Sequence, residues 1–168
     1  MDKVRYGIIG LGMGAVHIAG IKNIENAEVT AICDIDSAKL NDEAGKLGGN
    51  VHAYSDYRRV LEDKDVDAVV IAVPDQEHCK MSLEALDAGK HVLCEKPMSL
   101  KLEECSEMVR ASEKTDKKFM IGQICRFTPG FMQAKEMIDA GEDIEVKCYF
   151  CNSSYNFTIP DLIQLRAD

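Results

Sequence analysis

Short apolar segments alternate with segments of helical periodicity from the start of the chain, and this alternation constrains the fold more than any other feature. The apolar segments are VRYGIIG, EVTAICD, VHAYS, DAVVIAV, HVLCE and KFMIGQ. Strands separated by single helices form right-handed βαβ units, which build a parallel sheet with helices on both faces. We therefore predict an α/β protein with a doubly wound parallel sheet.

The segments between these strands carry helix signals. Asp56 precedes one of them as an N-cap, and Gly89 follows another as a C-terminal glycine. Leu102, Cys105 and Val109 form the apolar face expected of a later helix. The predicted helices cover residues 14–23, 37–46, 56–63, 75–88, a segment around 102–109, and 130–141.

The pattern changes after about residue 142. Residues 1–142, including the crossover helix 130–141, are predicted to form one domain. Residues 143–168 are β-rich and are predicted to begin a second, α+β domain. Strands that begin such a domain present unpaired edges, so we expect a homo-oligomer.

Composition excludes several classes of function. The 168 residues have a formal net charge of -9, which leaves no basic surplus for binding nucleic acid. No apolar run reaches the roughly 18 residues of a membrane span, and the N-terminus lacks a signal-peptide cleavage site. Seven scattered cysteines fit reduced thiols, and the strand spacing of Cys148 and Cys151 disfavours a redox pair or a metal site. We expect a cytoplasmic protein without membrane contact.

The first strand runs into the glycine-rich loop GLGMGA. Gly10 and Gly12 match the first two positions of the dinucleotide fingerprint, and Ala15 takes the third. Gly14 stands one residue early, next to Met13. A helix that begins near Gly14 would direct its amide end at the phosphates. This order of strand, loop and helix predicts that the domain of residues 1–142 is a dinucleotide-binding Rossmann domain.

Asp34 ends the second strand, at close to the spacing of about 20 residues after Gly12 that is expected for a carboxylate on the adenine ribose. An acid there favours NAD, since the 2′-phosphate of NADP would meet a like charge. Ile35 and Lys39 follow in the same loop and helix, and Lys39 keeps NADP possible. The alternative for Asp34 is a helix cap for the segment that starts at Ser37.

Ligands of a doubly wound sheet bind beyond the carboxyl ends of its strands. The segments AVPDQEH and CEKP, residues 72–78 and 94–97, end at that edge. Glu95 and Lys96 are therefore expected to face the same crevice as the cofactor. The alternative is a solvated strand end followed by a turn.

Four segments together, GIIGLGMGAVH, CDID, VPDQEHCKMSLEALDAGKHVLCEKP and GQICRFTPGF, resemble the glucose–fructose oxidoreductase and inositol dehydrogenase family, Gfo/Idh/MocA. The resemblance covers essentially the whole chain. It implies that Lys96 lies beside the nicotinamide as the catalytic residue and that Glu95 contacts the cofactor ribose or tunes Lys96. The Lys96–Pro97 bond is a candidate cis peptide.

The same resemblance assigns further residues to the cofactor site. The family's Pro-Asn-x-x-His appears here with Asp75 in place of Asn, and Gln123 and Arg126 match a segment at the junction with the substrate domain. Arg126 has the alternative of pairing with a carboxylate. His17 and His91 are expected to be packing or surface residues. The cofactor residues implied beyond the loop and Asp34 are Val73, Pro74, Asp75, Gln76, His78, Glu95, Lys96, Gln123 and Arg126.

The resemblance implies an NAD(P)-dependent oxidoreductase that transfers a hydride between nicotinamide and a hydroxyl or carbonyl carbon of a sugar, polyol or related small molecule. The resemblance also implies that residues 143–168 begin the family's second domain, which serves substrate binding or oligomerisation. In the family, that domain supplies a histidine for proton transfer. No histidine follows His91 in these 168 residues, so we expect this polypeptide to bind cofactor with little turnover of substrate. The alternative function is a non-catalytic dinucleotide-binding module or sensor.

Overall fold

The computed structural model describes residues 3–147, 151–161 and 164. The chain forms two compact units, Met1–Gly122 and Gln123–Asp168. The boundary between these two units lies before the predicted crossover helix 130–141. The functional domain boundary predicted at residue 142 stays a prediction.

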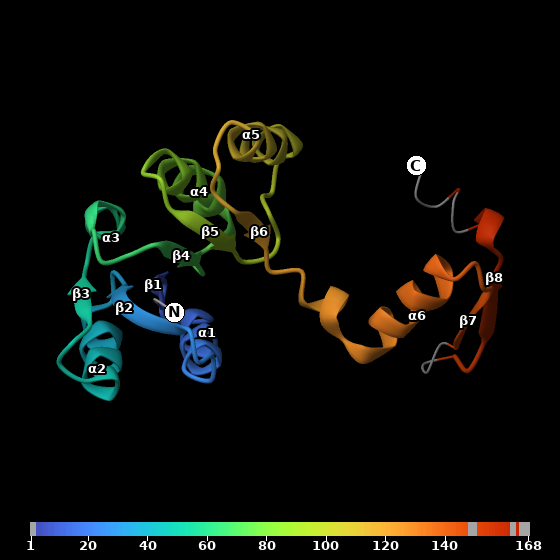
Figure 1. The fold of residues 1–168 in the computed structure, drawn as a ribbon, viewed down its shortest axis with the longest axis horizontal. Helices are drawn as coiled ribbons and strands as arrows, with labels where there is room; N and C mark the ends of the chain where they lie inside the picture. The colour runs from blue at the N-terminus through green and yellow to red at the C-terminus, as the bar shows by residue number, and fades with distance from the viewer. Residues whose placement is uncertain (1–2, 148–150, 162–163, 165–168) are drawn as a thin grey trace. The chain divides into compact units, whose positions relative to one another are not determined.

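The first unit is built on one six-stranded sheet in which all neighbouring strands run parallel (Figure 1). The order β3-β2-β1-β4-β5-β6 reverses direction between β1 and β4, which is the switch point at which such sheets bind ligands. The predicted doubly wound fold is confirmed. The strands are β1 Val4–Ile9, β2 Ala27–Cys33, β3 His52–Tyr54, β4 Ala68–Ile71, β5 His91–Cys94 and β6 Phe119–Ile121.

Helices cover both faces of this sheet. Apolar side chains of α1 and α2 pack against one face, and those of α3, α4 and α5 pack against the other. β4 lies at the centre and is buried along its whole length, as its continuous apolar sequence predicts. The helices are α1 Gly14–Ile21, α2 Ser37–Leu47, α3 Tyr57–Glu62, α4 His78–Asp87 and α5 Leu102–Ser112.

Local signals fix where several helices begin and end. The Asp56 carboxylate accepts a hydrogen bond from the Arg58 amide at 3.0 Å and caps α3, as predicted. α2 is capped by Asp36, so Asp34 is not its N-cap. Gly89 has φ +73 and follows Ala88, the C-cap residue of α4, in a backbone conformation that favours glycine.

Two of the predicted helices differ in detail. The segment 75–88 begins with a 3₁₀ turn, η1 Asp75–Glu77, because the Glu77 amide bonds the Pro74 carbonyl three residues back. The predicted apolar face of α5 was wrong. Its buried residue is Met108, while Leu102 is 78% exposed, because α5 packs against α4 through the side that carries Met108.

The second unit contains η2 Ile124–Phe127, α6 Pro129–Asp139 and an antiparallel pair of strands, β7 Ile144–Lys147 and β8 Ser154–Phe157. The expected start of a second, β-rich region is confirmed as this small sheet. Cys148, named in the prediction about the cysteine pair, lies outside the described residues. In the part of the chain that the structure describes, no helix is long and apolar enough to cross a membrane.

A bidentate ion pair joins β1 to the segment before β4. The Arg5 side chain donates from Nε and Nη2 to the two Asp67 oxygens at 3.0 and 2.8 Å, and the Arg5 amide donates to Oδ2 at 3.0 Å. These hydrogen bonds lower the pKa of Asp67 from 3.8 to about 2. A carboxylate with a lowered pKa stabilises the fold above its unfolded pKa and loses that contribution as the pH falls through its folded pKa.

We expect Asp67→Asn to lower the melting temperature at pH 7 and to reduce the loss of stability between about pH 4 and pH 2. Thermal unfolding followed across this pH range measures both effects. Asp65→Asn is the matched control, because Asp65 contacts the same guanidinium through one bond and its side chain is 62% exposed. Equal effects of the two substitutions would contradict the assignment.

Candidate functional site

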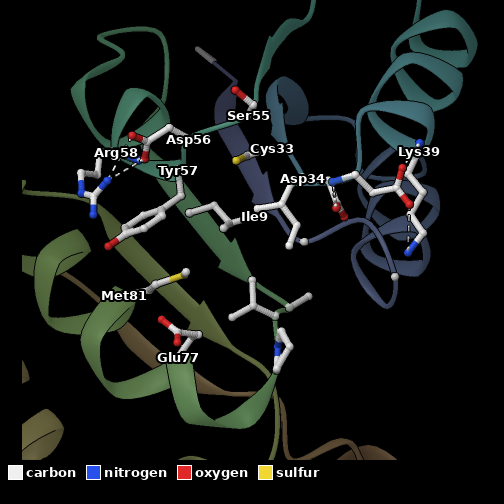
Figure 2. Close-up of a pocket in the computed structure, with 17 residues that line it drawn as sticks. Ile9, Cys33, Asp34, Lys39, Ser55, Asp56, Tyr57, Arg58, Glu77 and Met81 are labelled. Atoms are coloured by element: carbon white, nitrogen blue, oxygen red, sulfur yellow. Dashed lines mark hydrogen bonds and ion pairs between the residues drawn. The ribbon is translucent and has the colours of Figure 1, made fainter.

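A cavity of about 910 Å³ lies at the carboxyl edge of the sheet in the first unit (Figure 2). Its residues follow the ends of β1, β2, β3 and β4, so the parallel topology brings four separate segments together. The lining residues are Ile9, Gly10, Gly12, Cys33, Asp34, Ile35, Asp36, Lys39, Ser55, Asp56, Tyr57, Arg58, Ala72, Val73, Pro74, Glu77 and Met81.

The glycine loop packs tightly at one end and is open in the middle. Gly10 has φ +90, and a Cβ there would overlap the Ala72 carbonyl oxygen. A Cβ on Gly14 would come within 2.7 Å of the Ile8 side chain, so the close contact between helix and strand falls at Gly14, whereas the sequence fingerprint put it at Ala15. A Cβ on Gly12 would meet nothing within 4 Å. The open side of the loop thus allows a ligand to approach the backbone at Gly12.

The start of α1 supplies donors beside that opening. Met13 is the N-cap residue and its side chain makes no capping hydrogen bond. The first-turn amides of a helix have no partner within the helix, and together with the helix dipole they attract anions. Ala15 is half-buried and lies in this first turn of α1.

Asp34 is held by backbone amides on both of its oxygens. Oδ2 accepts from the Leu11 amide and Oδ1 from the Asp36 amide, each at 2.8 Å. These bonds fix the carboxylate at the cavity wall, where each oxygen keeps a lone pair for another donor. Lys39 also lines the cavity, and its amine lies 4.0 Å from Asp36. Ile35, between the two acids, is 94% exposed.

A second wall of the cavity, Ser55–Arg58 at the start of α3, was missed by sequence reasoning. The Tyr57 hydroxyl donates to Glu84 at 2.6 Å, and the Arg58 guanidinium lies 5.2 Å from the Tyr57 ring centroid. Burial, with the Glu84 contact, raises the pKa of Tyr57 to about 12. In Figure 2 this wall lies on the far side of Ile9 from Asp34. The position of this segment directly after β3 could have predicted it, because the carboxyl ends of all strands in a parallel sheet lie at the same edge.

The segment after β4 contains residues that line the cavity and one fully buried histidine. Val73 and Pro74, two of the predicted cofactor residues, line the cavity, and so do Glu77 and Met81, which were not predicted. Asp75 and Gln76, in η1, are not among the lining residues. His78 is fully buried, and its ring nitrogens contact the carbonyl oxygens of Val73 and Pro97.

Glu95 and Lys96 follow β5 at the same edge of the sheet. Glu95 is 8% exposed and its Oε1 lies 2.8 Å from His17 Nε2, so His17 has a specific partner that sequence reasoning did not assign. Lys96 is exposed, and the Lys96–Pro97 peptide is cis, as predicted. Gln123 and Arg126 belong to the second unit, at the start and within the turn η2.

Comparison of the sequence with known proteins supports a nucleotide site at this cavity. Residues 4–123 match the model of an oxidoreductase family with an NAD-binding Rossmann fold. The chain belongs to the Gfo/Idh/MocA oxidoreductase family. The resemblance inferred from its motifs is therefore confirmed.

Similar proteins are named inositol dehydrogenases. The chain is 34% identical over 142 residues to inositol 2-dehydrogenase of Salmonella typhimurium, covering 83% of this chain and 42% of that protein. It is 35% identical over 139 residues to myo-inositol 2-dehydrogenase of Thermotoga maritima, covering 82% and 41%. A structure of scyllo-inositol dehydrogenase from Lactobacillus casei with bound NAD(H) and scyllo-inositol matches with a TM-score of 0.78 at 31% identity, covering 83% and 42%. The chain spans about two fifths of the length of these relatives.

The residues of this chain fit a dinucleotide. An open glycine backbone and a helix N-terminus suit the pyrophosphate, and a fixed carboxylate suits a ribose diol. The thiol of Cys33 at the cavity wall stays neutral, because burial raises its pKa to about 12. The cavity thus offers donors for phosphate and an acceptor for ribose at different strand ends.

Gly12→Ala should leave the melting temperature almost unchanged and weaken NAD binding by about tenfold or more, because the methyl group occupies the space through which phosphate reaches the backbone. Calorimetric titration with NAD and thermal unfolding test the two halves of this prediction. Gly20→Ala on the same helix also adds its Cβ in open space. It should leave affinity unchanged and raise stability by about 0.5–1 kcal/mol. Equal losses of affinity in both variants would contradict the phosphate assignment.

Proposed function

We propose that this chain is the nucleotide-binding part of an NAD-dependent oxidoreductase that acts on a hydroxyl or carbonyl carbon of a polyol, sugar or related small molecule. The observation that carries the proposal is the shared cavity of the glycine loop and the Asp34 carboxylate, at the sheet edge where Lys96 follows the neighbouring strand. The names of the similar proteins support the polyol class.

The proposed cofactor contacts follow the order of the strands. The pyrophosphate would be held by the glycine loop and the start of α1, at Gly10, Gly12, Met13, Gly14 and Ala15. The adenine ribose would be bound by Asp34, with Ile35 and Lys39 beside it. The nicotinamide half would be bordered by Val73, Pro74, Asp75, Gln76, His78 and Glu95, with Gln123 and Arg126 at the junction to the substrate region.

Lys96 is the proposed catalytic residue. Bound NAD would supply the hydride acceptor for oxidation of a carbinol carbon. A lysine ammonium beside the reacting oxygen lowers the cost of the negative charge that develops when the hydroxyl proton leaves. The exposed side chain of Lys96, next to a buried carboxylate, supports this role because it is free to meet a substrate.

We also propose a cytoplasmic location and a homo-oligomer. Cys33, Cys79 and Cys94 are buried free thiols, which suits a reducing compartment. In the second unit, β7 and β8 form a sheet of two strands, a size that is marginally stable alone and is commonly extended by further strands.

Asp34→Ser should weaken NAD binding by roughly 10- to 100-fold and reduce the preference for NAD over NADP, because the carboxylate accepts from the ribose hydroxyls and repels a 2′-phosphate. Calorimetric titration of both cofactors gives the two affinities. Asp42→Ser removes one exposed carboxylate from α2, away from the cavity lining, and serves as the control. An unchanged NAD-to-NADP ratio in Asp34→Ser would contradict the assignment.

The function itself is tested by titrating the 168-residue protein with NAD(H) and by following NADH absorbance with a panel of inositols and sugar alcohols. We expect binding of NAD(H), with turnover that is low. A longer protein that continues past residue 168 should be assayed in the same way. If both proteins bind NAD(H) and neither oxidises any polyol, the dinucleotide-binding module is favoured. Absence of binding to either cofactor would overturn the proposal.

A further inference from the structure

Residues 95–97 are held by side-chain contacts with His17 and His78, two residues that have no role in the proposed hydride transfer. His17 Nε2 lies 2.8 Å from Glu95 Oε1, and the Lys96 amide donates to Glu95 Oε2 at 3.1 Å. His78 Nδ1 lies 2.8 Å from the Pro97 carbonyl oxygen. His78, from α4, therefore contacts the backbone after Lys96, and His17, from α1, contacts the Glu95 carboxylate that accepts from the Lys96 amide.

His78 connects the ends of two adjacent strands. Its side chain is fully buried, and its second ring nitrogen, Nε2, lies 3.0 Å from the carbonyl oxygen of Val73 after β4. The tautomer of the ring decides which of these two carbonyl oxygens accepts its N–H, and the other ring nitrogen contacts the second carbonyl. The buried ring therefore lies between the two loops that border the proposed nicotinamide position and contacts both.

Glu95 connects the same segment to the glycine-loop helix. The carboxylate is 8% exposed, and a buried charge of this kind persists only when it is paired. Its partners are the His17 ring and the Lys96 amide. On another side, the carboxylate faces Gly122, where an added Cβ would lie in ordinary van der Waals contact, 3.5 Å from the carboxyl carbon and both oxygens. Glu95 is thus held by its contacts with His17 and the Lys96 amide.

We propose that His17 and His78 are positioning residues that set the direction of Lys96 toward the nicotinamide ring. The Lys96 side chain is exposed, so its backbone is the part that the fold controls. His17, on the helix that follows the glycine loop, links to that backbone through the Glu95 carboxylate, and His78 links it to the loop after β4. This inference rests on the proposed function, because it assigns Lys96 to the nicotinamide end.

The test uses the ratio of NADH affinity to NAD⁺ affinity. An ammonium near the ring repels the cationic oxidised nicotinamide and not the neutral reduced form, so a correctly directed Lys96 raises this ratio. Lys96→Met should lower the ratio roughly fivefold. His17→Phe and His78→Leu, which remove the hydrogen-bonding nitrogens, should lower it by a similar factor. ADP-ribose lacks the ring, and its affinity should stay unchanged in all three variants.

Two comparisons separate positioning from general damage. His17→Gln and His78→Gln keep a side-chain donor and should restore part of the ratio. In the double variants with Lys96→Met, the histidine substitutions should change the ratio no further, because residues that act through one group are not additive.

His91→Leu is the matched control. His91 opens β5 at the other end of the strand, where its Nδ1 accepts from the Lys118 amide at 2.9 Å. It should leave the ratio as in the unmodified protein. If His78→Leu does not fold, as judged by circular dichroism, the His17 pair of variants carries the test.

The outcomes are distinguishable. If the unmodified protein binds neither NADH nor ADP-ribose, the proposed function fails and the inference fails with it. If Lys96→Met lowers the ratio and the histidine variants leave it unchanged, the inference alone is overturned. Equal losses of NADH, NAD⁺ and ADP-ribose affinity in the histidine variants would also overturn it, because that pattern reports a structural defect.

Discussion

The junction at which β1, β2 and β4 end is the constraint on which the site depends. The Gly10 amide donates to the Cys33 carbonyl at 2.8 Å, and the Ala72 amide donates to the Ile9 carbonyl at 2.8 Å. The strands can approach this closely because residue 10 has no Cβ to meet the Ala72 oxygen. One backbone junction therefore sets the glycine loop, the Asp34 loop and the β4 loop at fixed distances from one another.

Much of this arrangement follows from local sequence. Continuous apolar runs identify the buried strands, Asp56 identifies a helix start, and the spacing from Gly12 identifies Asp34, because each signal acts within one element or one βαβ unit. The wall formed by Tyr57 and its neighbours has no such local signal, since its place depends on which strand β3 lies beside. The burial of Met108 in place of Leu102 is likewise decided by the helix that α5 packs against.

The pairing of Glu95 with His17 shows why the proposed catalytic side of the site is harder to predict than the proposed phosphate side. The two residues are far apart in sequence, and each alone has a simpler explanation, a strand end and a packing histidine. Burying the carboxylate is unfavourable unless it is paired, so the structure requires a partner that sequence spacing cannot name. The consequence is a physical link between α1, the helix that follows the glycine loop, and the segment that carries the proposed catalytic residue, Lys96.

The proposed preference for NAD has a basis in the backbone rather than in net charge. A free aspartate side chain could rotate away from a 2′-phosphate, at the cost of its ribose contacts. Asp34 is restrained by amides on both oxygens, so rotation would also break two hydrogen bonds made by the loops themselves. Lys39 lines the same cavity, and its amine lies 4.0 Å from Asp36, whose carboxylate also lines it. The lysine therefore interacts with an acid other than Asp34, and we expect discrimination against the 2′-phosphate to remain with the fixed Asp34 carboxylate.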